Sequence, residues 1–149
     1  MLNINVSNAL LNAFFARGGS NSDIPTSAEC WLGVSTTTPV QNADGSIGNF
    51  TEPAAATGYA RVRLGIRGNA PTYKMSAASN SEIKNGSEEI HFNQALESGA
   101  GFGTVTHFGL FAAQSGGAPV VAGALTEPVT VPAGNILLAR VDQLKMSME

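Results

Sequence analysis

The sequence predicts a mainly β protein: an antiparallel β-sandwich or jelly-roll-like domain with one short N-terminal α-helix. Segments with strand character recur about every ten residues and are separated by turns rich in Gly and Pro, a pattern typical of antiparallel sandwiches. Only one segment, near the N-terminus, has helical spacing. A chain of 149 residues fits one domain. We therefore expect residues 1–19 to form an N-terminal segment that contains the helix, and residues 20–149 to form a single β-sandwich domain.

The N-terminal helix is predicted from its end signals and its apolar spacing. Ser7 is a suitable N-cap, and the pair Gly18 and Gly19 supplies a C-terminal stop. Between them, apolar side chains recur at intervals of three and four residues, which puts them on one helical face: Leu10, Leu11, Phe14 and Phe15. Such a short helix is not stable alone. We therefore expect its apolar face to dock, either on its own domain or on a neighbouring chain, where the helix would act as an anchor.

Two strands are predicted in the first half of the chain. Residues 28–40 have strand character and end near Pro39, which cannot donate to a ladder. Residues 41–58 are predicted to form a long polar connection. Residues 59–68 alternate between apolar and other side chains, so we expect a half-buried strand whose second face holds Tyr59, Arg61, Arg63 and Gly65. Residues 69–86 are expected to be mostly loop, with a short strand at 73–76 as an alternative.

The second half of the chain is predicted to contain a strand that is covered on both sides and several shorter strands. Thr104–Phe111 is apolar on both parities, as in a strand that is covered on both sides. A Gly-rich turn joins this strand to the next, so the two form a hairpin. The other elements are expected at short intervals: a strand at 87–95 after the turn signal Asn85-Gly86, the second hairpin strand at 120–125, a strand at 129–131, and one long closing strand from Ile136 onward.

The low charge of the chain limits the classes of partner. Only 13% of the residues are charged and the net charge is −3, whereas a typical soluble domain carries about 25% charged residues. A weakly charged surface suits a protein that packs against copies of itself or a larger assembly. The most basic stretch is the spaced set Arg61, Arg63 and Arg67, so binding of nucleic acid through phosphates is disfavoured. We expect these arginines to form either a solvated face or a contact with carboxylates of another subunit.

No segment predicts a membrane span or a signal peptide. No run approaches the roughly 20 apolar residues that cross a bilayer, and the N-terminus lacks a basic region followed by a cleavage pattern. We therefore expect a protein that is made in a cytoplasm and has no membrane partner.

The chain holds few residues with catalytic potential. The single cysteine, Cys30, cannot form an internal disulfide and lies in an apolar stretch, so a buried free thiol is expected. His107 would need a nucleophile such as Cys30 and an orienting acid such as Asp142 or Asp44, and these residues carry no signature of a cysteine protease. We expect no catalytic residue and no cofactor, and we keep an enzyme with a pocket around His107 or His91 as an alternative.

Metal binding is also disfavoured by the residues present. The two histidines, His91 and His107, are a minimal set for a metal site, and no cysteine pair assists them. The segment 42–52, NADGSIGNFTE, resembles a calcium loop, yet with Gly45 at the turn position the first ligand would be Val40. We expect no metal, and an irregular calcium site in this segment stays as the alternative.

Several motifs resemble a known family. GYARV (58–62), GTVTHFGLF (103–111) and GALTEPVTVPAGN (123–135) occur in this order, together with NALLNAFFARGG and CWLGVSTTTP. The set resembles small virion structural proteins of tailed bacteriophages, a tail-fibre-like or capsid decoration-like β module, and the resemblance runs from about Asn8 to about Leu144. It implies a non-enzymatic, β-structured component of the virion with no catalytic residues to transfer. It also places His107 in a motif that builds a sheet.

From the resemblance and the composition we expect a capsid decoration or cement protein that stabilises the head lattice of a tailed phage. It would be made in the host bacterial cytoplasm, be incorporated into the virion, and act as a homo-oligomer, expected to be a trimer. Its partner would be the major capsid protein. We expect it to bind neither nucleic acid nor a membrane. The candidate assembly contacts are Leu10, Leu11, Phe14, Phe15, Arg61, Arg63 and Arg67. The alternative is a tail-associated or tail-fibre module that recognises the host surface, in which Tyr73 and loop residues 42–50 would contact carbohydrate.

Overall fold

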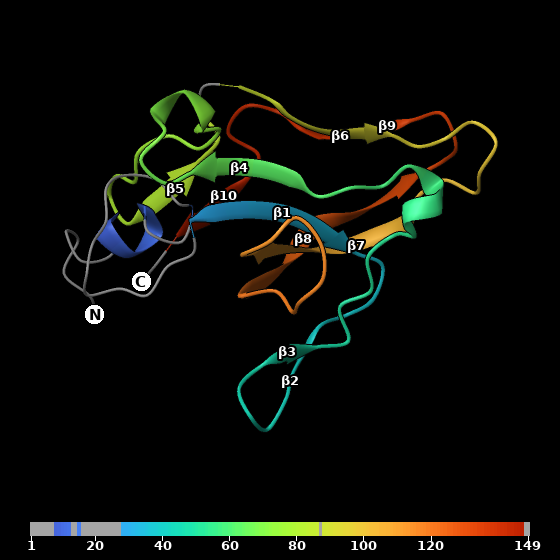
Figure 1. Cartoon of the computed structure of the whole chain (residues 1–149), viewed down its shortest axis with the longest axis horizontal. Helices are drawn as coiled ribbons and strands as arrows, with labels where there is room; N and C mark the ends of the chain where they lie inside the picture. The colour runs from blue at the N-terminus through green and yellow to red at the C-terminus, as the bar shows by residue number, and fades with distance from the viewer. Residues whose placement is uncertain (1–7, 13–14, 16–27, 87, 148–149) are drawn as a thin grey trace. The chain divides into compact units, whose positions relative to one another are not determined.

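The computed structural model describes residues 8–12, 15, 28–86 and 88–147 (Figure 1). Residues 8–12 are α-helical, and two short 3-10 helices follow, η1 (Ala55–Thr57) and η2 (Ala70–Thr72). The predicted mainly β class with a short N-terminal helix is confirmed. The strands are β1 (Glu29–Ser35), β2 (Val40–Gln41), β3 (Ile47–Gly48), β4 (Val62–Ile66), β5 (Glu82–Lys84), β6 (Ile90–Gln94), β7 (Gly103–Phe111), β8 (Val121–Val131), β9 (Ile136–Ala139) and β10 (Lys145–Ser147).

The described strands are arranged in one larger sheet and three ribbons. The larger sheet has the strand order β4-β1-β7-β8, and the ribbons pair β5 with β10, β2 with β3 and β6 with β9. The pairs β1–β7, β7–β8, β5–β10 and β2–β3 are antiparallel. The chain divides into two compact units: unit 1 comprises Met1–Cys30, Arg63–Ile90 and Leu138–Glu149, and unit 2 comprises Trp31–Val62 and His91–Leu137. The predicted division into an N-terminal segment and one β-sandwich domain stays a prediction.

Unit 2 contains the hairpin that the sequence predicted. β7 pairs with β8 from Gly103↔Val131 to Leu110↔Val121. β8 is one strand of 11 residues, so the strands predicted at 120–125 and 129–131 are parts of a single element. The register shifts between Val105 and His107, which pair with Val129 and Ala124. The shift lies opposite the stretch of β8 that contains Pro128. A proline nitrogen has no hydrogen to donate to the ladder, and this accounts for the interrupted pairing.

Side chains on both faces of this hairpin are buried, as predicted for β7. Leu110 and Phe111 are consecutive in the strand and therefore point to opposite faces, yet both are buried. Glycines make room for the aromatic rings, since a Cβ at Gly109 would lie 2.8 Å from the ring of Phe50. A Cβ at Gly33, which pairs with Gly109 across the strands, would lie 2.8 Å from the ring of Phe111. These glycines therefore serve packing.

Residues 36–51 of unit 2 form an extended hairpin that carries β2 and β3 (Figure 1). The sequence predicted only a polar connection here. At the base of this hairpin, the buried Oγ of Ser35 accepts hydrogen bonds from the N–H groups of Thr37 (3.1 Å) and Thr51 (2.9 Å). The Thr36 N–H donates to the Thr51 carbonyl at 2.9 Å. The hydroxyl-rich run STTT therefore ties the two arms of the hairpin together where the regular ladder stops.

In unit 1 the structure corrects two predictions. Residues 69–86 are mostly loop, as expected, with η2 and β5 among them, but the described residues 73–76 do not form the alternative strand. The single closing strand predicted from Ile136 onward is also wrong. β9 ends at Ala139, and β10 begins at Lys145 and pairs with β5.

The side chain of Asn85 accounts for this break. It is fully buried, and its Nδ2 donates to the carbonyl oxygens of Glu88 (3.0 Å) and Arg140 (2.9 Å), while its Oδ1 accepts from the Leu144 N–H (3.0 Å). Asp142, inside the turn, has a φ of 65°, a left-handed conformation that strands do not adopt. The buried amide therefore holds a turn in a stretch whose apolar residues would otherwise continue a strand.

The N-terminal helix packs within its own chain, in unit 1. Leu11 and Phe15 are 0% and 1% exposed, and Leu10 is half-buried. The sequence left open whether the helix docks on its own domain or on a neighbouring chain. These side chains are covered by their own chain. The predicted cap Ser7, the stop at Gly18 and Gly19, and Phe14 lie outside the described residues.

Two asparagines of the helix reinforce this packing. The Oδ1 of Asn12 accepts a hydrogen bond from the Ala78 N–H, and the Oδ1 of Asn8 accepts one from the Ser81 N–H, both at 2.9 Å. The helix therefore braces the segment that precedes β5. Within the described part of the chain, no helix is long and apolar enough to cross a membrane.

Candidate functional site

Arg61, one of the three predicted contact arginines, is buried inside unit 2. Its side chain is 3% exposed. The guanidinium binds Glu52 in a bidentate manner, with Nε–Oε1 at 2.8 Å and Nη2–Oε2 at 2.7 Å, and its Cζ lies 3.3 Å from the ring centre of Phe111. Its Nη1 also donates to the carbonyl oxygens of Ala113 (2.8 Å) and Gly116 (2.9 Å). Arg61 therefore clamps the turn between β7 and β8.

Glu52 also accepts a hydrogen bond from the hydroxyl of Tyr59. The Tyr59 O–H donates to Glu52 Oε1 at 2.9 Å and accepts a hydrogen bond from the Val34 N–H at 3.0 Å. Burial raises the pKa of the Tyr59 phenol, and the neighbouring Glu52 carboxylate raises it further. The group of Glu52, Tyr59 and Arg61 is therefore a closed polar network within unit 2, with its donors directed at acceptors of the same chain.

Arg63 and Arg67 differ from Arg61 in exposure. The Arg63 side chain is 43% exposed, and its Nη1 lies 3.7 Å from Glu29 Oε1. Arg67 is half-buried, and its N–H donates to the Ala28 carbonyl at 2.8 Å. The structure thus separates Arg61 from the other two members of the predicted strip, because its guanidinium is covered by its own chain. A role of Arg63 or Arg67 in a contact between subunits stays a prediction.

The residues considered for chemistry have local structural partners. His107 lies in β7, half-buried, with its Nδ1 at 2.8 Å from the Thr106 Oγ1. The prediction that Cys30 is a buried free thiol is confirmed, and burial raises its pKa to about 12. The thiol is therefore neutral at ordinary pH, whereas nucleophilic attack needs the thiolate. Among the described residues, no group of three or more His, Cys, Asp or Glu side chains could hold a metal ion.

The loop considered for calcium uses its carboxylate internally. Asp44 is the acidic residue of the segment 42–50, and its Oδ1 accepts hydrogen bonds from the Ser46 N–H (2.9 Å) and the Ser46 hydroxyl (2.6 Å). The hydrogen bond from the Ser46 hydroxyl lowers the pKa of the Asp44 carboxyl most, and the bond from the Ser46 N–H lowers it further. Asp44 therefore shapes the tip of the β2–β3 hairpin as an Asx turn.

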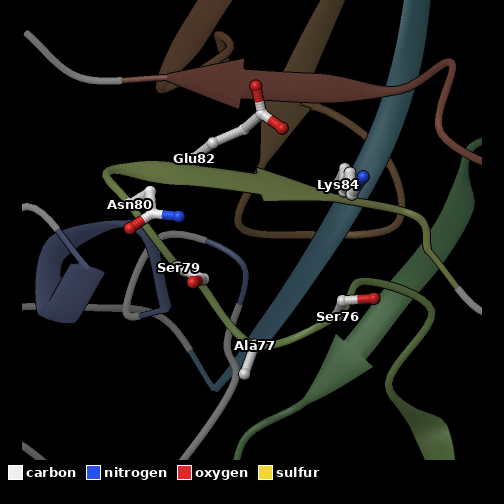
Figure 2. A pocket seen from close by; sticks show the side chains of 6 residues that line it. All are labelled: Ser76, Ala77, Ser79, Asn80, Glu82 and Lys84. Atoms are coloured by element: carbon white, nitrogen blue, oxygen red, sulfur yellow. The ribbon is translucent and has the colours of Figure 1, made fainter.

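A polar cavity of about 370 Å³ lies in unit 1, around the turn that leads into β5 (Figure 2). Two backbone hydrogen bonds of 2.9 Å, donated in opposite directions between Ser79 and Glu82, close this turn. Its central residues, Asn80 and Ser81, have left-handed φ angles of 51° and 60°, as in a type I′ turn. We call this feature the polar cavity, and its lining residues are Ser76, Ala77, Ser79, Asn80, Glu82 and Lys84.

The sequence did not identify the polar cavity, because residues 69–86 were expected to be mostly loop. The available signal was the run SAASNSE, which is rich in hydroxyl and amide side chains and contains an Asn that tolerates a left-handed conformation. Tyr73, proposed as a carbohydrate contact, is half-buried and its hydroxyl accepts a hydrogen bond from the Gly68 N–H at 3.1 Å.

A known protein family has a model that matches almost the whole chain. The model of the family described as podophage GP4 fiber I protein gp80 matches residues 3–147. No curated protein matches the chain. The resemblance to phage virion structural proteins that the motifs indicated is thereby confirmed.

Proposed function

Because this chain belongs to the family of podophage GP4 fiber I protein gp80, a family of phage structural proteins, we propose that it builds part of a fibre on the virion. The observation that carries the proposal is the extent of the family match, which includes almost the whole chain. The protein is a phage structural protein whether it lies on a fibre or on the head. A fibre position is the finer statement, and the family description favours it over the head decoration that we expected from the sequence.

The geometry supports a mechanical role. The sheet of unit 2 is covered on both faces at Leu110 and Phe111, and the buried Arg61 clamps the turn beside it. Interiors packed in this way are stiff and transmit strain, which suits a part that carries load. We propose that the protein is not an enzyme, since the local partner of His107 and the neutral thiol of Cys30 are typical of structural residues.

The edge strand β8 supports association with further copies of the chain. β8 is the last strand in the order of the larger sheet, and its ten residues before Val131 are all exposed or half-buried. Val129 and the adjoining Val120 are 40% and 57% exposed. A long edge strand is a template for pairing with another chain. We propose a homo-oligomer that uses this edge, with the trimeric state and the sandwich arrangement as predictions, and with virion proteins as its partners, not nucleic acid or a membrane.

The proposal is tested on purified phage particles. Quantitative mass spectrometry gives the copy number relative to the major capsid protein, and immunogold labelling gives the position. A small copy number with label on the tail or its fibres supports the proposal. About one copy for each capsid subunit, with label over the head, would replace it by head decoration, the competing role.

A further inference from the structure

We propose that the polar cavity of unit 1 binds one ring of a neutral saccharide. Its volume of about 370 Å³ lies in the range of roughly 300–1,000 Å³ that small-molecule sites have. Five of the six lining residues have polar side chains, and Ala77 is the apolar one. A ring that carries several hydroxyl groups matches such a lining because each hydroxyl both donates and accepts hydrogen bonds.

Three side chains of the polar cavity have hydrogen-bonding capacity to spare. In the described part of the chain, the side chains of Ser79, Asn80 and Glu82 take part in no hydrogen bond or ion pair. They supply a hydroxyl, an amide and a carboxylate, which together offer donors and acceptors to one ligand. Figure 2 shows Ser79 and Asn80 at one end of the polar cavity, and Ser76 and Lys84 at the other.

Hydrogen bonds within the chain hold the frame of the polar cavity. The turn that carries Asn80 is closed by the two Ser79–Glu82 backbone bonds of 2.9 Å, and the helix braces it through the bond from the Ser81 N–H to Asn8 Oδ1. At the other end, the Ser76 N–H donates to the Lys84 carbonyl at 2.7 Å. A preformed site loses less conformational entropy on binding than a flexible one.

The charges of the polar cavity favour a neutral ligand over an ion. The Lys84 Nζ lies 3.1 Å from Asp142 Oδ1, so its positive charge is already balanced. The Glu82 carboxylate is the remaining charge, and it disfavours an anion. A divalent cation would need more carboxylates, and the described residues hold no metal-binding group of three or more. An aromatic ligand would need an apolar wall, which Ala77 alone does not provide.

The binding experiment uses the full chain labelled with 15N and a set of free monosaccharides: glucose, galactose, rhamnose and N-acetylglucosamine. The expected result is a set of amide shifts in residues 76–84 for at least one sugar, with a dissociation constant on the order of 1 mM. Inorganic phosphate and calcium serve as charged probes. Shifts in residues 76–84 with either ion but with no sugar would overturn the proposal, as would the absence of shifts with every sugar.

Variants of the turn separate binding from folding. Asn80→Gly removes the amide but suits the φ of 51°, so the variant should fold with unchanged or higher thermal stability and bind the sugar about tenfold more weakly. Glu82→Gln should weaken binding by a similar factor. The matched controls are Asn93→Ala and Glu127→Gln, at exposed positions of β6 and β8, which should bind like the parent chain. Equal affinity of Asn80→Gly and the parent would overturn the assignment.

This inference deepens the proposed fibre role, because a sugar site has a use in a part that meets a host surface. The binding measurement needs only the isolated protein, whereas the fibre role is tested on particles. If no sugar binds but the label lies on the fibres, the sugar site is wrong and the fibre role stands. If a sugar binds but the label lies over the head, the fibre role is wrong and the sugar site stands.

Discussion

The sharpest test of the structure compares two arginines that the sequence presents as equivalents, Arg61 and Arg63. Arg61→Met keeps an aliphatic side chain but removes the guanidinium, which leaves the Glu52 carboxylate without its cation and the carbonyls of Ala113 and Gly116 without their donors. Breaking a buried pair from one side costs about 3–5 kcal/mol of unfolding free energy. Since about 1 kcal/mol shifts the melting temperature of a domain of this size by roughly 2–4 °C, we expect a decrease of roughly 6–20 °C.

Arg63→Met is the matched control. Its ion pair with Glu29 is 3.7 Å long between side chains that are 43% and 36% exposed, and such surface pairs contribute about 0–1 kcal/mol. Urea unfolding followed by the fluorescence of Trp31, together with thermal melts, measures both variants. Equal losses for Arg61→Met and Arg63→Met, or a loss below about 1 kcal/mol for Arg61→Met, would refute the clamp.

Three further predictions concern the backbone and the buried groups. Asn85→Ala leaves two partly buried backbone carbonyls and one buried N–H group without their partner, so unfolding free energy should fall by roughly 3 kcal/mol, measured by urea unfolding; a loss under about 1 kcal/mol would contradict its role in the 139–144 turn. Gly101→Ala should cost roughly 2–4 kcal/mol, because φ is 76° and the new Cβ would overlap the Val131 carbonyl, whereas Gly116→Ala, with φ of 70° and open space, should cost about 1 kcal/mol; thermal melts compare the two. Cys30 has a pKa raised from 9.0 to about 12 by burial, so its contribution to stability is fully present below pH 9 and is lost as the pH rises from about 9 towards 12. Cys30→Ala should flatten this alkaline decline above pH 9, and an unchanged slope in urea titrations would show that another group causes it.

Much of unit 2 could be predicted because its signals are local. The apolar run of Thr104–Phe111, the Gly-rich turn after it and the apolar residues that follow lie next to one another in the sequence, and β7 pairs with β8 as this order implies. A hairpin needs only neighbouring segments, so pattern and turn chemistry are enough to predict it. The burial of Cys30 was predicted in the same way, from the apolar residues beside it.

The pairing in unit 1 could not be predicted, because it depends on residues far apart in the chain. β5 is three residues long, mostly polar, and pairs with β10 about 60 positions later. Three residues carry too little periodicity to indicate a strand. The break between β9 and β10 likewise depends on the amide of Asn85, which reaches Arg140 and Leu144 across the same distance in sequence.

The polar cavity could not be predicted from the sequence either. Its lining residues lie within nine positions of the sequence, yet the cavity exists only because the turn at Asn80 and Ser81 adopts left-handed angles and because Asn8 and Asn12 of the helix brace it. The run of hydroxyl and amide side chains could indicate a turn, but the sequence does not specify which of these groups have partners.

The sequence by itself determined the mainly β class, the hairpin of unit 2, the buried thiol and the phage virion family, since each follows from local alternation, turn residues or motifs in order. Only the tertiary structure decided that Arg61 is a buried clamp while Arg63 is exposed. Residue parity places both side chains on one side of an alternating strand, but it does not specify what covers that side. Glu52, Phe111 and the turn after β7 come from distant parts of the chain, and only folding brings them to Arg61.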